Sequence, residues 1–449
     1  MSETDLKQDK PAHQNVVTHQ NVVTHQNVVT LGCRLNAFES EAMRGMLARI
    51  GDDKTMIVNS CAVTNEAVRQ TRQTIRKLRK SNPDARIVVT GCAAQIDPDQ
   101  FLAMNEVDQV VGNREKLQES SFKNHDASLL HGNIFDDGLI LPEQEMPEAP
   151  LLNDFGARAR AFVQVQTGCD HRCTFCIIPY GRGNSKSTPA GQVVTQIQHL
   201  VKNGVKEIVL CGVDMTAYGR DLPVAGGLGA LVAQILKLVP DLQRLRLSSM
   251  DCSEVDDQLK SLIINEERIL PHLHLSLQAG DMMMLKRMKR RHSPEQAVML
   301  ADELRQHRPD LVFGADLIAG FPTEDDAMFQ RTLAHIDDVG LTWLHVFPFS
   351  PKIGTPAAKI PNQLSKLEIK QRAKLLRDKG ETRAAHYRKS LLGTRESLLI
   401  ESQHENHYSG HSLGFAQVKL HSDIPLQHNH VYPVQFNAIA GKYLIAEMV

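Results

Sequence analysis

The feature that most constrains this chain is an array of three cysteines placed directly after a strand-like apolar run. Cys169, Cys173 and Cys176, here called the loop triad, follow residues 161–166 with a C-x3-C-x2-C spacing. Structural zinc normally takes four protein ligands, whereas a cubane iron-sulfur cluster held by three thiolates leaves one iron open. His171 offers zinc a fourth ligand, but no second C-x2-C or H-x3-H pair follows nearby. The array therefore predicts an iron-sulfur cluster with an open iron.

The composition limits the class of protein. Of the 449 residues, 42% are hydrophobic and 23% are charged, which is ordinary for a globular chain of two or three domains. No apolar run approaches the roughly 20 residues that span a bilayer, and the first twelve residues lack a signal-peptide core. We therefore expect a cytoplasmic protein with no membrane contact. In that reducing compartment, eight cysteines indicate metal binding rather than disulfides.

A hexapeptide, HQNVVT, is repeated three times near the amino terminus, starting at His13, His19 and His25. Only the third copy runs on into LGC, so we expect this copy alone to provide a strand. Two spare copies cannot bury a core of their own. We interpret residues 1–24 as a duplicated, disordered extension.

Beyond the repeat, strand-like runs alternate with helical patterns. The runs occupy residues 28–31, 55–58 and 86–89, and the helical patterns occupy residues 36–50 and 66–80. This alternation predicts an α/β domain with a parallel sheet, which we assign to residues 25–135. Asn36 and Glu39 have the spacing of a capping pair at the start of the first helix.

Three further cysteines fall at equivalent places in this domain. Cys33, Cys61 and Cys92, here called the strand-end triad, each come directly after a predicted strand. The carboxyl ends of parallel strands lie along one edge of a sheet, so these thiols are expected to converge. One buried cysteine would be a small hydrophobe, but three at equivalent positions predict a metal site. Cys211 and Cys252 fit neither triad and are assigned to the core.

Residues 136–154 have the acidic, proline-containing composition of a linker, and a central domain is assigned to residues 155–386. Six strand-like runs, mostly separated by helical segments, occupy residues 162–166, 207–211, 244–247, 272–277, 312–318 and 343–348. Eight such units would close a barrel, so six predict an open partial (β/α)6 barrel with its active residues at the carboxyl ends of the strands. Short alternating runs then predict a small, closed or nearly closed β-barrel in residues 387–449.

Nearly the whole chain resembles the methylthiotransferase branch of the radical S-adenosylmethionine (SAM) enzymes. The resemblance rests on TGCDHRCTFCIIPYGR around the loop triad and on LGCRLNAFESE, NSCAVTNEA and VTGCAAQ around the strand-end triad. It implies two [4Fe-4S] clusters, one on each triad, with SAM chelated by the open iron of the loop-triad cluster. It also implies that residues 387–449 form a TRAM domain, an OB-like RNA-binding module. A barrel of this size is equally suited to binding a protein or capping the core.

The resemblance further implies residues that line the SAM and substrate cavity. Phe175, just before the last cysteine of the loop triad, is placed near the adenine of SAM. The others follow the strands of the partial barrel and are Gly212, Asp214, Ser248, Ser276, Gln278 and Asp316. Glycine, serine and aspartate are also ordinary turn residues at strand ends, so each position has a purely structural alternative.

Local positive patches indicate contact with RNA in a chain whose net charge is −1. One patch is the run KRMKRRH, from which we assign RNA contacts to Lys286, Arg287, Lys289, Arg290 and Arg291. The other is a predicted helix face that carries Arg69, Arg72, Arg76, Lys77, Arg79 and Lys80. Most charge runs are merely solvated helix faces, but both patches flank segments with cluster or cavity residues.

The resemblance implies a transferase that places a methylthio group on C2 of N6-threonylcarbamoyladenosine at position 37 of tRNA, 3′ to the anticodon. The strings RLN after Cys33 and AVTN after Cys61 resemble this branch of the family. The ribosomal-protein branch, which modifies an aspartate, has proline at the place of Arg34, and the isopentenyladenosine branch differs after both cysteines. Both remain alternatives, as does a non-catalytic metal-containing RNA-binding protein.

The implied partners are tRNA, a low-potential electron donor of the flavodoxin or ferredoxin type, and a sulfur donor.

Overall fold

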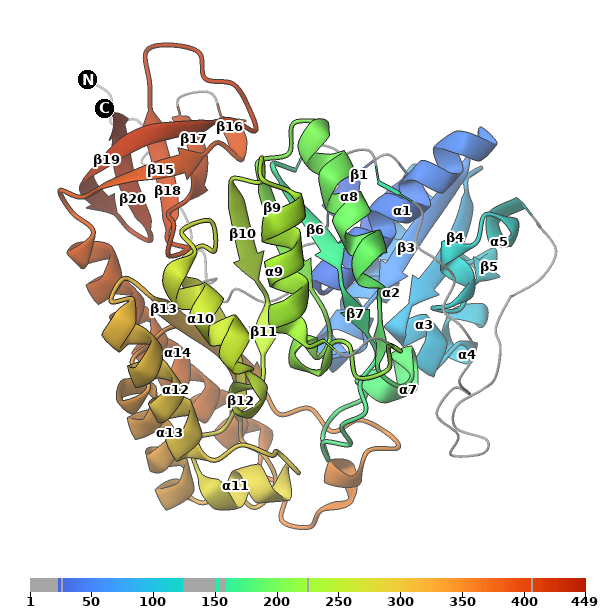
Figure 1. Ribbon diagram of the computed structural model, residues 1–449. Helices are drawn as coiled ribbons and strands as arrows, with labels where there is room; N and C mark the ends of the chain where they lie inside the picture. The colour runs from blue at the N-terminus through green and yellow to red at the C-terminus, as the bar shows by residue number, and fades with distance from the viewer. Residues whose placement is uncertain are drawn as a thin grey trace, which may run out of the picture.

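The computed structural model describes residues 23–25, 27–123, 151–152, 155, 158–223, 226–404 and 407–449. Residues 1–22 of the expected extension and most of the expected linker lie outside this description. Figure 1 shows an amino-terminal α/β unit and a C-terminal β unit on different sides of a central barrel. None of the helices in the described ranges is long and apolar enough to cross a membrane.

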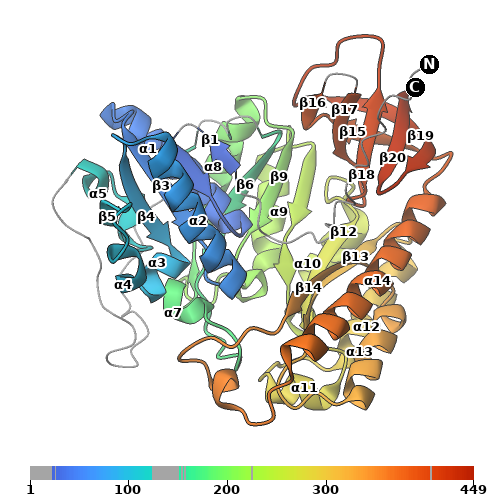
Figure 2. The ribbon, with the colours of Figure 1, turned by 180° about the vertical axis from the view of Figure 1, so that it is seen from behind.

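The amino-terminal unit is a five-stranded sheet in the order β1-β2-β3-β4-β5. Its parallel strands are β2 (Val28–Thr30), β3 (Thr55–Ser60), β4 (Arg86–Gly91) and β5 (Gln109–Val110). These strands are buried on both faces and are rich in valine and isoleucine, as expected for a parallel sheet covered by helices. The longest of these helices are α1 (Arg34–Ile50) and α2 (Asn65–Ser81), seen from behind in Figure 2. The predicted parallel α/β fold is confirmed.

The edge of this sheet begins earlier than expected. β1 (Val23–His25) pairs antiparallel with β2, so Val23 and Thr24 of the second hexapeptide copy belong to the sheet. An edge strand presents unpaired N–H and C=O groups, which the preceding segment of a repeat can satisfy. The prediction that only the third copy forms a strand was wrong for this reason.

Helix α1 begins directly after Cys33, as expected, but Asn36 and Glu39 do not cap it. Cys33 is the N-cap, and no side chain makes a capping hydrogen bond. Asn36 and Glu39 are both buried and point toward the central domain, where they bond to Arg182. A capping pattern reports only on local sequence, and long-range partners override it here.

The central unit is the predicted partial barrel of six parallel strands, each followed by a helix. The strands are β6 (Arg160–Gln164), β9 (Glu207–Cys211), β10 (Arg244–Leu247), β12 (His272–Gln278), β13 (Val312–Ala319) and β14 (Leu341–Pro348). They form the sheets β6-β9-β10 and β11-β12-β13-β14, in which β11 (Ser249–Met250) continues the line of β10. β6 and β14 are the two open edges.

Six helices cover the outside of the barrel (Figures 1 and 2). They are α8 (Ala190–Lys202), α9 (Leu228–Leu238), α10 (Asp257–Asn265), α12 (Pro294–His307), α13 (Asp326–Asp338) and α14 (Lys366–Ser390). The main apolar core lies between these helices and the strands, and it also contains Phe38 and Met43 of α1. The amino-terminal unit therefore shares the core of the barrel at the β6 edge.

The C-terminal unit is a six-stranded curled sheet in the order β15-β19-β20-β18-β17-β16. Its strands are β15 (Arg395–Leu399), β16 (Ser402–His404), β17 (His407–His411), β18 (Gln417–His421), β19 (Val431–Ala440) and β20 (Tyr443–Met448). The sheet curls into a half-barrel rather than a closed one. Sequence analysis missed β16 and β17, because histidine, serine and glycine give no strand pattern.

A buried ion cluster joins this unit to the amino ends of the barrel strands. Glu207 accepts hydrogen bonds from Arg244 Nε and Arg246 Nε, each at 2.7 Å. The same arginines donate to backbone carbonyls of Ser397, Ser412 and Leu413. Burial alone would raise the pKa of Glu207, but Arg246 and Arg244 lower it to about 2. The C-terminal sheet thus lies at the opposite end of the barrel from the carboxyl ends of its strands.

We predict that Glu207→Ala loosens the C-terminal sheet. Two buried guanidinium groups would lose their counter-charge, which costs about 3–5 kcal/mol. Amide hydrogen exchange in β15 and β17 should accelerate accordingly. Glu303→Ala, which removes an exposed pair with Lys260, is the control and should cost about 1 kcal/mol or less.

The stability of the fold should depend on pH with a defined sign, because the pKa of Glu207 is depressed in the folded state. The ionised Glu207 should contribute fully to the free energy of unfolding above pH about 4.5. This contribution should be lost as the pH falls toward about 2. Unchanged exchange in Glu207→Ala would show that the cluster does not hold the sheet.

Candidate functional site

The two cysteine triads share one cavity of about 300 Å³, whose lining includes all six thiols. Cys33 lies at the start of α1, Cys61 follows β3, and Cys92 begins α3 (Cys92–Ile96) directly after β4. The loop triad lies between β7 (Gln166–Thr167) and α7 (Ile178–Arg182). The structure therefore brings together the thiols that the strand-end argument expected to converge, and it places the loop triad opposite them.

The spacing of the thiols suits clusters better than single zinc ions. In the described part of the chain, three groups of at least three potential ligands have donor atoms within 4.8 Å of one another. Neither triad is such a group, so the three sulfurs of a triad do not all lie that close together. The sulfurs bound to one tetrahedral zinc ion lie about 4 Å apart. A cubane instead spreads three cysteines over three irons. The donor set and its spacing therefore fit two [4Fe-4S] clusters.

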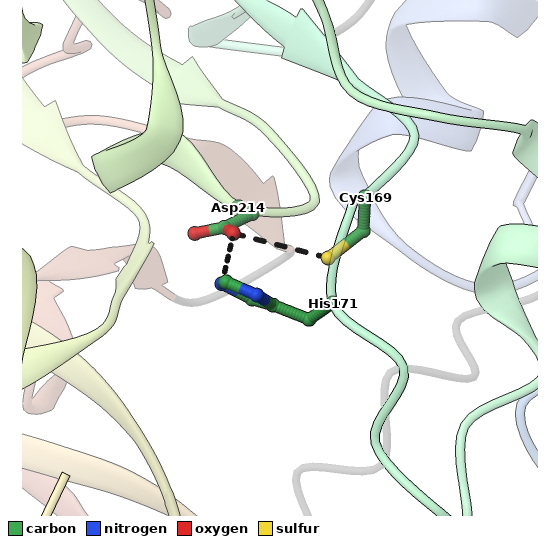
Figure 3. A group of neighbouring side chains, drawn as sticks. All are labelled: Cys169, His171 and Asp214. Atoms are coloured by element: carbon green, nitrogen blue, oxygen red, sulfur yellow. Dashed lines mark hydrogen bonds and ion pairs between the residues drawn. The ribbon is translucent and has the colours of Figure 1, made fainter. Parts of the chain in front are cut away.

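His171 does not behave as a fourth ligand of the loop triad. Its Nε2 lies 2.8 Å from Asp214 Oδ2, and the Cys169 thiol lies 3.8 Å from the same oxygen (Figure 3). Hydrogen bonds to Asp214 and Glu254 raise the pKa of His171 to about 9. A protonated imidazole has no free lone pair for a metal. Among the described residues, His171 groups with Cys169 and Asp214 as potential ligands of one ion and not with all three cysteines of the loop triad.

Burial also raises the pKa of several thiols in the two triads. It raises the pKa of Cys61 and of Cys176 to about 12, and it raises the pKa of Cys33 as well. The thiolate is the form that binds iron, so a bound metal must displace these protons.

Two residues next to the loop triad hold its backbone in place. Gly168 has φ +68, and a Cβ there would lie 1.9 Å from the Asn184 carbonyl oxygen, so only glycine fits. Gln166 is fully buried and makes five hydrogen bonds. Its amide donates to Thr167 O, Gly168 O and Ser185 Oγ, and its Oε1 accepts from the backbone N–H groups of residues 213 and 214.

Gln166 was not singled out by sequence analysis. The available signal was a buried polar residue at the end of an apolar strand, where a side chain must find partners. Its partners tie the loop triad to the end of β9, which carries Gly212 and Asp214.

A buried ionic cluster connects the two triads. Arg182, at the end of α7, donates to Glu39 at 2.7 Å and to Asn36 Oδ1 at 2.7 Å, both on α1. Lys116 Nζ lies 2.6 Å from the other oxygen of Glu39. Burial alone would raise the pKa of Glu39, but Arg182 and Lys116 lower it to about 2. Two cations therefore face one anion beside Cys33 and Cys92, which leaves one positive charge to offset the thiolates.

The cavity also contains every residue expected to contact SAM or substrate. Its lining includes Phe175, Gly212, Asp214, Ser248, Ser276, Gln278 and Asp316. Asp316 Oδ1 lies 2.9 Å from His274 Nε2 and 3.2 Å from His345 Nδ1. Sequence analysis missed both histidines. For His274 a signal was available, because the alternation HLHLSLQ in β12 puts it on the same face as Ser276 and Gln278, which line the cavity.

The basic run after β12 is not a single surface patch, contrary to expectation. Arg290 lines the cavity, donating to Ser276 O at 2.6 Å and Asp251 Oδ2 at 2.8 Å. Arg287 bonds to Thr323, and Arg291 pairs with Glu254. Only Lys286, Lys289 and Arg291 are exposed. The run follows α11 (Met282–Arg287) through a tight turn, so alternate members face inward.

Comparison with known proteins gives two family matches. Residues 163–336 match the radical SAM superfamily, and residues 25–112 match the uncharacterized protein family UPF0004. Among solved structures, the radical SAM methyltransferase TsrM from Kitasatospora setae, with cobalamin and a [4Fe-4S] cluster bound, has a TM-score of 0.51. The match covers 70% of this chain and 73% of TsrM at 14% identity, so it supports the fold alone.

Curated relatives match most of the chain. The threonylcarbamoyladenosine tRNA methylthiotransferase MtaB of Rickettsia prowazekii is 47% identical over 87% of this chain and 90% of its own length. MtaB of Bacillus subtilis is 32% identical over 87% and 88%. The tRNA-2-methylthio-N(6)-dimethylallyladenosine synthase of Ehrlichia canis is 30% identical over 90% and 95%. Both cysteine triads line one cavity, and these relatives match most of the chain over most of their own length. The chain therefore belongs to the radical SAM tRNA methylthiotransferase family.

Proposed function

We propose that the protein is a transferase that adds a methylthio group to C2 of N6-threonylcarbamoyladenosine at position 37 of tRNA. The observation that carries the proposal is the single cavity onto which both cysteine triads open. The relatives named MtaB, up to 47% identical, favour this substrate over the dimethylallyladenosine of other relatives. An aspartate of a ribosomal protein and a non-catalytic RNA-binding role have no comparable support.

Each triad would hold one [4Fe-4S] cluster, with SAM at the open iron of the loop-triad cluster. When bound, these groups supply reductive cleavage of SAM and a methylthio group, which acid–base chemistry cannot provide at an aromatic C–H carbon. The chain itself supplies position. Gln166 and Gly168 fix the loop triad, while Glu39 and Arg182 fix its placement relative to the strand-end triad.

Several cavity residues would orient SAM and the base. Phe175 offers an aromatic face for the adenine of SAM, and Asp214 and Ser248 offer polar groups at the ends of their strands. The reaction also needs a low-potential electron donor, for which we propose a flavodoxin or ferredoxin, and a sulfur donor. We place this activity in the cytoplasm, where tRNA is modified.

The tRNA backbone would be bound by exposed cations around the cavity. Lys286 and Lys289 are exposed beside the loop triad, and Arg72, Lys77 and Lys80 are exposed on α2. Residues 387–449 would add further contacts as a TRAM-like module. Such contacts position the tRNA without reading its sequence.

Nucleoside mass spectrometry of tRNA from cells that lack the protein tests the substrate directly. We expect 2-methylthio-N6-threonylcarbamoyladenosine to disappear and its unmethylthiolated precursor to accumulate. Disappearance of the 2-methylthio dimethylallyl nucleoside instead would assign the protein to the other branch.

We predict that the two triads are separable. Cys173→Ala should lose about half of the iron and all SAM cleavage, because the open iron that binds SAM is removed. Cys61→Ala should also lose about half of the iron, yet still cleave SAM without forming methylthiolated product. Cys252→Ala, at a buried cysteine outside both triads, is the matched control and should keep its full iron content. Formation of methylthiolated product by Cys61→Ala would contradict the assignment of a second cluster to the strand-end triad.

A second prediction concerns the tRNA backbone. Replacing both Lys286 and Lys289 with alanine should weaken tRNA binding and lower the magnitude of the slope of log K against log salt by about 2. Each phosphate contact that is lost means that about one counterion fewer is released on binding. Exposed Lys366 and Lys370 on α14 give the control pair. An unchanged slope in the Lys286/Lys289 variant would place the phosphate contacts elsewhere.

A further inference from the structure

Three guanidinium groups line the cavity, those of Arg34, Arg182 and Arg290. Two of them have protein partners. Arg182 is held by Glu39 and Asn36, and Arg290 is held by Asp251 and a backbone carbonyl. These two arginines therefore have a structural role before any ligand arrives.

Arg34 differs from both. It is the first residue of α1, it lines the cavity, and within the described ranges its side chain makes no hydrogen bond or ion pair. Its side chain is half-buried, and its charged neighbours include Arg160 and Asp316. Arg160 is itself paired with Glu401, at 3.0 Å. A half-buried guanidinium that no carboxylate of the described residues contacts keeps its N–H groups available for an anionic group of a ligand.

The surroundings of Arg34 form a polar floor to the cavity. Asp316 accepts hydrogen bonds from His274 and His345, whose rings lie 4.4 Å apart between centroids. We define the polar floor as Arg34 and Asp316, which line the cavity, together with His274 and His345, which bond to Asp316 behind the lining. A floor of one unpaired cation beside hydrogen-bonding groups suits an anionic, hydroxyl-bearing substituent. It does not suit a hydrocarbon, which would offer the Arg34 guanidinium no acceptor.

The substituent on N6 of threonylcarbamoyladenosine ends in the carboxylate and hydroxyl of threonine, whereas a dimethylallyl group is apolar. The planar guanidinium fork matches a carboxylate in a bidentate arrangement. We propose that Arg34 binds the threonyl carboxylate of the tRNA substrate and thereby sets the choice of N6 substituent. This inference rests on the proposed function, because it concerns the substrate of that reaction.

The test crosses an enzyme variant with a substrate variant. Anaerobically reconstituted full-length protein is assayed with two anticodon stem-loop RNAs, one with N6-threonylcarbamoyladenosine and one in which the threonyl carboxylate is a methyl ester. Both the dissociation constant and kcat/KM are measured. Loss of a charge-assisted contact should make wild type bind the ester roughly 10- to 100-fold more weakly than the acid.

Arg34→Gln should lose affinity for the acid by the same factor and should bind the ester like wild type. Arg34→Lys, which keeps the charge without the fork, should recover part of the loss on the acid alone. Arg49→Gln is the matched control, since Arg49 lies at the other end of α1 and pairs with Glu119 on the surface. This control should discriminate acid from ester as wild type does.

The outcomes separate this inference from the proposed function. Equal losses of affinity on acid and ester in Arg34→Gln would overturn the carboxylate contact. So would a reduced iron content in that variant, which would show that Arg34 supports the strand-end cluster instead. A wild-type enzyme that prefers dimethylallyladenosine RNA would overturn the proposed function itself, whatever Arg34 does.

Discussion

The contact of Glu39 with Arg182 and Lys116 is the interaction on which the shared site depends. Each triad is built on the carboxyl-end loops of its own parallel sheet, and two separate sheets need not face each other. Arg182 ends the loop-triad segment, while Glu39 lies one and a half turns into the helix that begins at Cys33. Their buried ion pair, at 2.7 Å, therefore fixes one triad relative to the other. An ion pair this deep needs further hydrogen bonds, which Lys116 gives to Glu39 and Asn36 accepts from Arg182.

The distribution of charge around the cavity follows from this arrangement. Arg182 and Arg290 sit near the thiols of the two triads and are neutralised in part by carboxylates. Arg34 lies on the polar floor with no such partner among the described residues. The cations with partners can compensate the negative charge of thiolate-bound clusters, and the remaining cation is left for a ligand. Within one cavity, Arg182 and Arg290 thus lie where they compensate cluster charge, and Arg34 lies where it can bind the substrate.

Much of this site could be predicted because strand ends are regular. Cys33, Cys61 and Cys92 were grouped from their places after strands. The residues from Gly212 to Asp316 were expected on the cavity from the family resemblance, and their places at strand ends agree with it. Contacts between the amino-terminal unit and the central barrel could not be predicted this way. Glu39 has the spacing of a capping residue, yet its partner lies 143 residues away. Arg290 belongs to a basic run, but a tight turn directs it inward. The hydrogen-bond partners of Gln166 and the place of Arg34 on the cavity both follow from the folded structure rather than from local sequence.

The central claim is that both triads hold clusters that face one cavity. Electron paramagnetic resonance of the reduced, anaerobically reconstituted protein tests it directly, because magnetic coupling between two paramagnetic clusters falls steeply with distance. The account predicts that the wild-type spectrum is broadened and split relative to the sum of the spectra of Cys61→Ala and Cys173→Ala, each with one cluster. A wild-type spectrum equal to that sum would contradict the shared cavity, and signals from a single cluster would contradict the second site.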